Sequence, residues 1–270
     1  MTVQASLFDP SLLGTGLLDP TSSEPSLFDE VGAEAPVGDG PDPDLGSLTG
    51  TVRHQLARGA WVDLLPGWLS GGGLLERLLA DVPWCAERRP MYDRVVDVPR
   101  LLCHYAEGEP LPHPTLEAIR DALNARYAPE LGEPLVSTGL CLYRDGADSV
   151  AWHGDTIGRG RTSDTVVAIL SLGSPREFLL RPRGGSAVAR AIAGADLSGL
   201  RATSAQPVVP SRPVPSRAVT GTGTIRHTLH HGDLVVMGGS CQRTWEHAVP
   251  KTTRSVGPRV SIQLRPRGVS

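Results

Sequence analysis

The chain has 270 residues, of which 40% are hydrophobic and 20% charged, which allows one large globular domain or two small ones. Its four cysteines are scattered without a Cys-x-x-Cys pair, which argues against a disulfide framework or a zinc ribbon and favours a reducing compartment. No stretch approaches ~18 uninterrupted apolar residues, and the N-terminus lacks the basic start of a signal peptide, so we expect a cytoplasmic protein with no membrane partner.

The formal net charge of −3 averages two unlike parts of the chain. Residues 1–50 contain nine acidic and no basic side chains and are rich in Gly, Pro and Ser, which predicts an acidic disordered tail. Residues 51–270, the expected globular domain, carry 26 basic and 20 acidic side chains, a net of +6. A basic body suits a polyanionic partner such as nucleic acid, although ordinary surface charge explains so modest an excess equally well.

The tail contains two similar peptides, because residues 6–9 and 26–29 both read Ser-Leu-Phe-Asp. The first copy is fuller, since residues 4–8 read Gln-Ala-Ser-Leu-Phe. This peptide resembles the short motifs that bind the bacterial replication sliding clamp, and the alternative is a chance match in flexible chain. The resemblance implies partner contacts by Gln4, Leu7 and Phe8.

Two helices are expected before the strands begin. Leucines recur at helical spacing from residue 74 to 79, and Pro83 ends this helix. Pro114 begins the second helix, with Glu117 near its positive end. We interpret the apolar stripe of each helix as packing against the core.

Short β-like runs follow residue 131, separated by Gly and Pro. They cover residues 136–143, 149–153, 165–172, 177–181, 233–237 and 259–264. Many short strands after two helices predict a mainly β fold of the α+β class, with flanking helices and a jelly-roll or β-sandwich core.

Residues 184–226 interrupt the expected strands as a loop rich in Pro and Arg. A loop of this length in a compact domain is usually functional or disordered. Its arginines would suit phosphate contact if the loop is functional, and a solvated linker is the slightly favoured alternative.

A candidate metal site combines His153, Asp155 and His247. The first two end a β-like run as His-Gly-Asp, so their side chains are expected on one face of the strand. Two imidazoles and one carboxylate form the ligand set that holds a non-heme Fe(II) and leaves coordination positions open. A second His-Gly-Asp at 231–233 has only His247 downstream, and we expect Asp233 to cap a turn instead.

Two arginines share one face of the last expected strand. Arg259 and Arg265 are backed by apolar side chains, and such cations are costly unless an anion meets them. A planar guanidinium binds a carboxylate in two-point contact, so Arg259 can clamp a dicarboxylate cosubstrate. The two Cα atoms would lie about 20 Å apart on a straight strand, which makes Arg259 the safer assignment.

Four segments carry a resemblance to a known family: residues 142–155, 171–173, 245–247 and 258–265. Together they resemble the AlkB family of Fe(II)- and 2-oxoglutarate-dependent dioxygenases, over about residues 130–267. The resemblance implies a double-stranded β-helix (jelly-roll) core, Fe(II), 2-oxoglutarate and O2 as cofactors, and oxidative removal of alkyl groups from bases of DNA or RNA. Formaldehyde, succinate and CO2 would be released, and the protein would associate with the nucleoid when bound to DNA.

The resemblance also assigns roles to particular residues. His153, Asp155 and His247 match the iron ligands, while the expected cosubstrate residues are Tyr143, Arg259, Arg265, Ser261 and Cys141. Two positions depart from the family, because Cys141 and Ser261 replace asparagines that help to hold the cosubstrate in many members. These changes leave cosubstrate affinity and substrate range open.

Nucleic-acid contacts are expected from two loops. An alkylated base has to leave its stack or arrive single-stranded to reach the iron. Tyr92 and Arg94 offer an aromatic ring and a cation for a base-recognition lid, or else belong to an ordinary surface turn. Arg159 and Arg161 lie in a Gly-rich loop and suit phosphate contact, with a solvated loop as the alternative.

Two other functions stay open at this point. One is a 2-oxoglutarate oxygenase that acts on a protein or small molecule. The other is a clamp-tethered nucleic-acid-binding module with a degenerate site, prompted by Cys141 and Ser261. Turnover of 2-oxoglutarate with and without nucleic acid would separate the first of these from nucleic-acid dealkylation. Stoichiometric iron binding together with succinate production would eliminate the second.

Overall fold

The computed structural model describes residues 43–91, 94–156, 158–184 and 223–269. These residues all belong to one compact unit, Asp39–Ser270. The clamp-motif residues Gln4, Leu7 and Phe8, the lid residue Tyr92 and most of the 184–226 loop lie outside the described residues.

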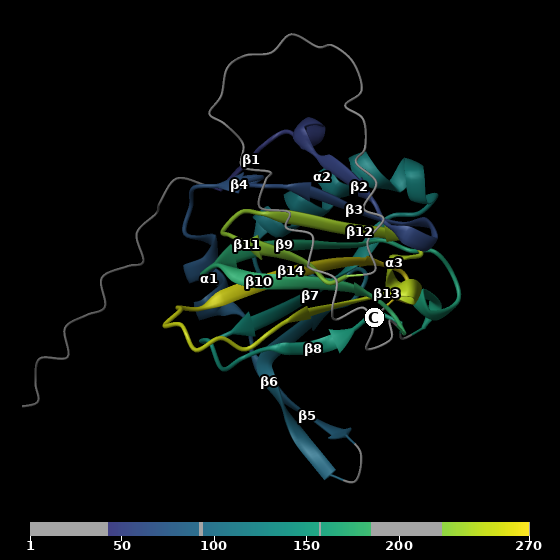
Figure 1. Cartoon of the computed structure of the whole chain (residues 1–270). Coiled ribbons are helices and arrows are strands. Elements are labelled where there is room, and N and C mark those ends of the chain that lie inside the picture. Colours follow the sequence, from purple (N-terminus) through teal and green to yellow (C-terminus); the bar gives the residue numbers. More distant parts are fainter. Residues whose placement is uncertain (1–42, 92–93, 157, 185–222, 270) are drawn as a thin grey trace, which may run out of the picture. The chain divides into compact units, whose positions relative to one another are not determined.

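Two antiparallel sheets form the body of this unit (Figure 1). The eight-stranded sheet has, in spatial order, β2 (Val52–Gln55), β3 (Ala60–Leu65), β12 (Leu234–Gly239), β9 (Val167–Gly173), β14 (Arg259–Pro266), β7 (Leu135–Tyr143), β6 (Arg94–Tyr105) and β5 (Cys85–Met91). The four-stranded sheet has β11 (Ile225–Leu229), β10 (Arg176–Pro182), β13 (Trp245–Val249) and β8 (Val150–His153). This is the double-stranded β-helix, or jelly roll, expected from the sequence.

Apolar side chains from both sheets fill the layer between them. The larger sheet contributes Val167, Ile169, Val235 and Met237, and the smaller contributes Phe178, Leu180, Ile225 and Trp245. Because side chains alternate between the faces of a strand, polar residues in phase with these positions also enter this layer. That alternation is what carries the candidate site residues into the interior.

Two helices cover the other face of the larger sheet. They are α1 (Leu74–Asp81) and α2 (Pro114–Leu131), and the apolar stripes expected on both are buried against the sheet. Helix α2 begins with Pro114 and ends at Gly132, whose φ of +75° suits a residue without a side chain. The predicted helices and their packing role are therefore confirmed.

The ordered fold begins earlier in the chain than residue 51. Strand β1 (Asp44–Leu45) pairs with β4 (Leu69–Ser70), and the Gly46 N–H donates to the Trp68 carbonyl at 2.7 Å. Leu45 and Leu48 pack against the helix-side core, the latter from the 3-10 turn Leu48–Gly50. Two leucines in an acidic, Gly- and Pro-rich stretch are too few to show a strand or helix period.

The end of the inserted loop is also structured. Strand β11 starts at Ile225 and pairs along β10, so residues 225–226 belong to the smaller sheet and not to the loop. Arg226 lies 3.6 Å from Glu177 across this pairing, in an exposed ion pair.

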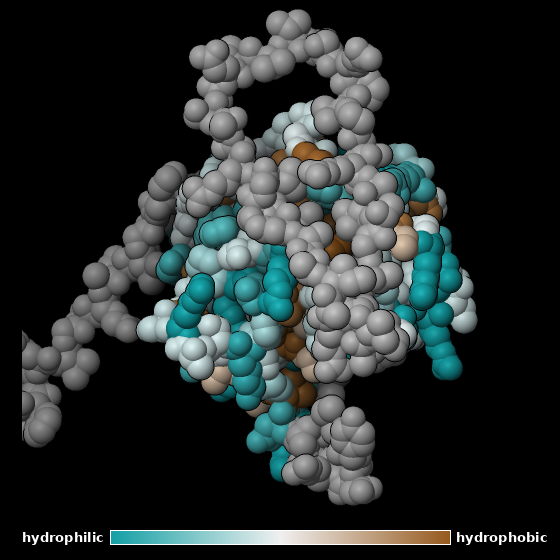
Figure 2. Space-filling model, in the orientation of Figure 1, coloured by the Kyte–Doolittle hydropathy of each residue, from teal (hydrophilic) through white to brown (hydrophobic). Residues whose placement is uncertain are grey.

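The described surface is mainly polar. Figure 2 shows chiefly hydrophilic side chains on the described part of one face. Among the described residues, Val52 is the one large hydrophobic residue that is exposed, at 41%. None of the helices among the described residues is long and apolar enough to cross a membrane.

Candidate active site

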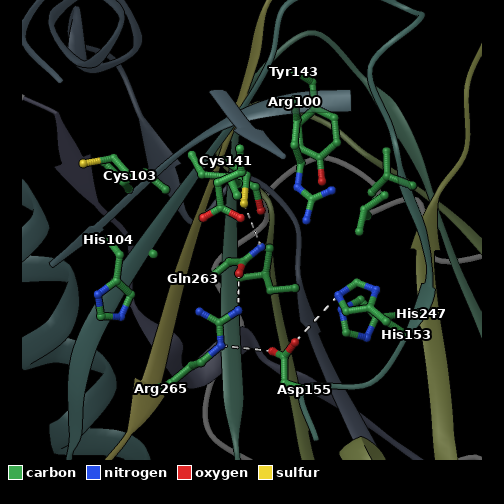
Figure 3. Close-up of a pocket in the computed structure, with 18 of the residues that line it drawn as sticks. Arg100, Cys103, His104, Cys141, Tyr143, His153, Asp155, His247, Gln263 and Arg265 are labelled. Atoms are coloured by element: carbon green, nitrogen blue, oxygen red, sulfur yellow. Dashed lines mark hydrogen bonds and ion pairs between the residues drawn. The ribbon is translucent and has the colours of Figure 1, made fainter. Parts of the chain in front are cut away.

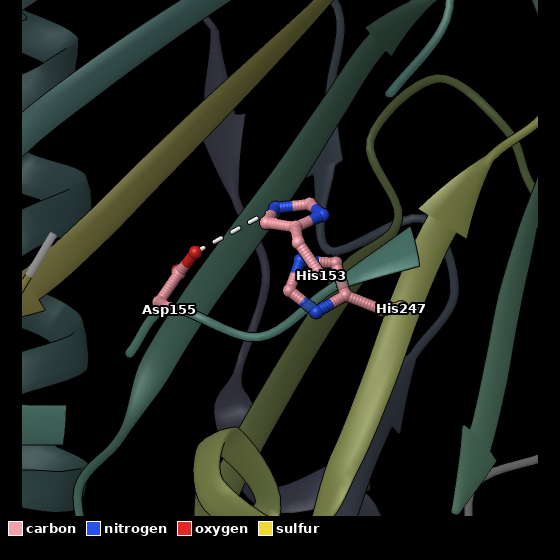
Figure 4. Close-up of side chains that lie close together, drawn as sticks. All are labelled: His153, Asp155 and His247. Atoms are coloured by element: carbon pink, nitrogen blue, oxygen red, sulfur yellow. Dashed lines mark ion pairs between the residues drawn. The ribbon is translucent and has the colours of Figure 1, made fainter. Parts of the chain in front are cut away.

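His153, Asp155 and His247 come together at one end of the smaller sheet (Figure 4). His153 ends β8 and is the direct cross-strand partner of His247 on β13. Asp155 follows β8 by two residues, and its Oδ1 lies 3.7 Å from His153 Nε2. The candidate ligand atoms of all three residues lie within 4.8 Å of one another, so these side chains can converge on one metal ion.

Hydrogen bonds fix the orientation of this group. The backbone N–H of Asp155 donates to Gln242 Oε1 at 2.9 Å, and His153 Nδ1 lies 2.8 Å from the Ala151 carbonyl. A proton on Nδ1, donated to that carbonyl, leaves Nε2 free as a metal ligand. Between the two ligands, a side chain at Gly154 would come within 2.3 Å of the Gln242 carbonyl, so the turn requires glycine.

The protonation states suit a cation. Burial raises the pKa of Asp155, but Arg265, His247 and His153 outweigh burial and lower it to about 2. Burial, followed by the neighbouring His153, lowers the pKa of His247 to about 3. Asp155 is therefore ionised and His247 neutral near pH 7, as metal ligands must be.

A cavity of about 750 Å³ opens beside these three side chains (Figure 3). Its volume is in the usual range for a small-molecule site. The five residues expected to contact the cosubstrate all line it: Cys141, Tyr143, Arg259, Ser261 and Arg265. They come from the adjacent strands β7 and β14, where Tyr143 pairs with Arg259 and Cys141 with Ser261.

Arg259 is a buried cation without an anionic partner among the described residues. It is 1% exposed, its Nε donates to Ser171 Oγ at 2.9 Å, and its guanidinium lies 5.1 Å from the Tyr143 ring centre. Its Nη1 is buried without a hydrogen-bond partner, and burial lowers its pKa. An uncompensated buried charge is costly, so the site fits a ligand that brings a carboxylate.

Arg265 occupies the metal end of the same strand. Its Nε donates to Asp155 Oδ2 at 3.0 Å, and its side chain is 12% exposed. The two arginines therefore do not converge on one point, in line with their separation along β14. Arg265 neutralises the metal-ligand carboxylate, while Arg259 is free to accept an anion.

Two further cavity residues were missed from the sequence. Arg100 on β6 has a buried Nε without a partner, while its Nη1 donates to the Ser149 carbonyl at 3.2 Å. Gln263 on β14 contacts both Cys141 and Arg265. Strand β6 was not expected because it contains Pro99, although the apolar pairs 95–96 and 101–102 are typical of a strand. Alternation along β14 places Gln263 on the same face of the strand as Arg259.

The expected nucleic-acid residues are only partly described. Arg159 and Arg161 lie in the short 3-10 helix Arg159–Arg161. Arg159 pairs with Glu133, whereas Arg161 is exposed. Arg94 begins β6 opposite Met91, but its side chain, like Tyr92, lies outside the described set.

Trp152 does not pack in the core, although it is a large apolar side chain next to His153. It is instead half-buried on the outer side of the smaller sheet, with the Arg181 guanidinium 4.1 Å from its ring centre. A strand of a two-sheet fold has only one face toward the core, and here His153 occupies it.

Similarity to known proteins identifies the family of this chain. Residues 65–265 match the model of the 2OG-Fe(II) oxygenase superfamily. The chain belongs to this superfamily. It is 29% identical over 229 residues to the human alpha-ketoglutarate-dependent dioxygenase alkB homolog 3, covering 77% of this chain and 68% of the relative. The AlkB-family membership expected from the sequence is thereby confirmed.

Two further proteins are similar to parts of this chain. The Arabidopsis thaliana DNA oxidative demethylase ALKBH2 is 29% identical over 150 residues, covering 54% of this chain and 42% of the relative. The solved structure of OsALKBH1 aligns at 13% identity with a TM-score of 0.44, covering 76% of this chain and 96% of that one.

Proposed function

We propose that this oxygenase oxidatively dealkylates N-alkylated bases of DNA or RNA, using Fe(II), 2-oxoglutarate and O2. The observation that carries the proposal is one cavity lined both by the His-Asp-His group and by Arg259, whose buried Nη1 has no partner. The names of the relatives, a dioxygenase dependent on alpha-ketoglutarate and a DNA oxidative demethylase, supply the substrate class.

The chain's own side chains prepare the metal position. His153, Asp155 and His247 would hold Fe(II), which with its cosubstrate supplies the oxidant that hydroxylates the N-alkyl carbon before formaldehyde is lost. Arg265 keeps Asp155 ionised and oriented. Phe178, with its ring centre 5.6 Å from that of His247, shields this side of the site from water.

The cosubstrate position is prepared by the neighbouring strands. Arg259 would pair with the distal carboxylate of 2-oxoglutarate through Nη1, while Ser171 holds its Nε in place. Burial raises the pKa of Tyr143 to about 12, so the phenol keeps its proton and can donate. Cys141 and Ser261 line the space between Arg259 and the metal ligands.

Nucleic-acid contact is proposed for residues at the rim. Arg94 is the first residue of β6 and pairs with Met91 of β5. Tyr92 and Arg94 are proposed as part of a base-recognition lid. Arg161 is exposed and free to meet phosphate, while Arg159 would first have to leave Glu133. Exposed ion pairs are weak, so this exchange costs little.

The test is a formaldehyde assay on a panel of N-methylated DNA and RNA oligonucleotides. We expect release that requires Fe(II), 2-oxoglutarate and O2, and loss of both metal binding and release in His153→Ala. The matched control is His230→Ala, because the side chain of His230 is 62% exposed and outside the cavity. Turnover of 2-oxoglutarate without release from any oligonucleotide would favour a protein or small-molecule substrate.

A further inference from the structure

The cavity wall formed by the larger sheet is organised in cross-strand rows. The first row is Tyr143, Arg259 and Gly173, and the second is Cys141, Ser261 and Ser171. The third row places Gln263 between Gly139 and Ile169. Along β14 the side chains therefore run from the free guanidinium of Arg259 to Gln263 and then to Arg265, which binds Asp155.

The amide of Gln263 has only one orientation that satisfies its neighbours. An arginine side chain only donates hydrogen bonds, so the oxygen of the amide must be the atom that meets it. In the structure Oε1 accepts from Arg265 Nη2, and Nε2 points the opposite way, 3.5 Å from Cys141 Sγ (Figure 3). The contact with Arg265 thus fixes which end of the amide faces the row of Cys141.

The nitrogen of this amide has donor capacity to spare. It carries two hydrogens, and its contact in the cavity is a thiol sulfur, which is a weak acceptor. The neighbouring polar groups have other tasks, because Ser171 holds Arg259 and Arg265 holds Asp155. Gln263 therefore presents an amide donor between the free cation and the metal ligands.

We infer that Gln263 is a further cosubstrate-binding residue, whose Nε2 donates to the keto-acid end of 2-oxoglutarate while its Oε1 keeps Arg265 on Asp155. This inference rests on the proposed function. Arg259 would bind the distal carboxylate at one end of the cavity. A diacid that extends from there toward Asp155 passes the amide of Gln263.

Gly139 makes room for this arrangement. It is the direct cross-strand partner of Gln263. A Cβ at this position would lie 2.9 Å from Arg265 Nη1 and 3.8 Å from Gln263 Oε1. The absence of a side chain here leaves the space that the amide and the guanidinium share.

The experiment measures 2-oxoglutarate binding by calorimetry, on full-length protein saturated with Mn(II) so that no turnover occurs. Gln263→Met keeps the length of the side chain and removes both amide atoms, and we expect binding about 10-fold weaker for loss of a hydrogen bond to a charged group. Gln55→Met is the matched control, because Gln55 is exposed on β2, and it should leave the affinity unchanged.

A second variant separates donation from mere support of Arg265. In Cys141→Asn/Gln263→Met an amide is returned one row away, so 2-oxoglutarate affinity should rise by more than Cys141→Asn alone raises it in the wild-type background, while Mn(II) affinity stays at the level of Gln263→Met. The inference is overturned if the 2-oxoglutarate affinity of Gln263→Met is within about twofold of wild type, because a lost hydrogen bond would lower it further. A loss that persists undiminished in the double variant overturns it as well. Absence of 2-oxoglutarate binding in the wild-type protein would instead overturn the proposed function.

Discussion

Arg259 illustrates how a single residue can be held ready for a ligand. Its guanidinium is almost fully buried, with one nitrogen bound to Ser171 and another without a partner. The fold supplies the surrounding contacts but not the counter-charge. The cost of burying this cation is recovered when a carboxylate arrives, which ties cosubstrate binding to this one side chain.

Replacing this cation tests that dependence. We expect Arg259→Met to weaken 2-oxoglutarate binding at least about 100-fold, because a buried charge-assisted contact is lost. Thermal stability should not fall, since the variant removes an uncompensated buried charge. Calorimetry on the Mn(II)-loaded protein measures the 2-oxoglutarate affinity, and a thermal melt measures the stability. Mn(II) affinity serves as the control because Arg259 does not contact the metal ligands. Retained 2-oxoglutarate affinity would contradict the assignment.

At the scale of single strands, β7 and β14 set the distance between the two ends of the cavity. Gly139 on β7 lies against Arg265 of β14, with no room for a side chain. We expect Gly139→Ala to displace Arg265 from Asp155 and to weaken Mn(II) binding several-fold, with a smaller effect on the melting temperature. The control is Gly257→Ala, because Gly257 lies outside the cavity and has no positive φ. An added Cβ there would lie 3.1 Å from Ser174 Oγ, a side-chain atom that has to shift slightly. Unchanged Mn(II) affinity in Gly139→Ala would show that the Arg265 side chain can shift without losing its contact with Asp155.

Strands β2 and β3 carry further buried polar side chains. Asp63 binds Arg53 and the Tyr127 hydroxyl on the helix side, while His54, on the opposite face of β2, has a buried Nε2 that lacks a partner. Burial lowers the pKa of His54, against an opposing effect of Asp63. The unfolded chain therefore takes up a proton at higher pH than the folded chain does.

The sign of the resulting pH dependence follows from linkage. A histidine whose pKa is lowered on folding reduces stability as pH falls below its unfolded value of about 6.5, by less than about 1.4 kcal/mol per pH unit. We expect the free energy of unfolding to decline between pH 7 and 5, and to decline less in His54→Leu. Urea denaturation at several pH values measures this, and parallel curves for variant and wild type would exclude His54 as the cause.

The sequence predicts some of these elements better than others, for physical reasons. Strands β7, β9 and β14 were expected because apolar side chains alternate or run continuously there. Strand β13 (Trp245–Val249) was missed because two of its five residues, Glu246 and His247, are charged or polar. They interrupt the apolar pattern that would have indicated a strand. His247 was still found, because it completed a ligand set whose chemistry is independent of strand assignment. Gln263 was not, because its role depends on a contact with Arg265 that only the packed sheets create.

At the scale of the whole molecule, chemistry and recruitment fall on different parts of the chain. The described residues contain the candidate metal, cosubstrate and cavity groups, while the clamp-like peptide lies at residues 4–8. If the acidic tail serves only to bring the enzyme to a partner, changes in the peptide should affect localisation on DNA without affecting chemistry. Tail and domain can then be tested independently.

The clamp-like peptide at residues 4–8 yields the corresponding prediction. We expect Leu7→Ala/Phe8→Ala to weaken binding to the bacterial sliding clamp at least about 10-fold, because two apolar anchors of a short peptide supply most of its affinity. Formaldehyde release from free oligonucleotides should stay the same. Leu27→Ala/Phe28→Ala is the matched control, since the second copy has the same four residues but lacks the glutamine two positions before the serine. Surface plasmon resonance with immobilised clamp measures the affinity, and equal binding by all three proteins would leave the peptide without a role in recruitment.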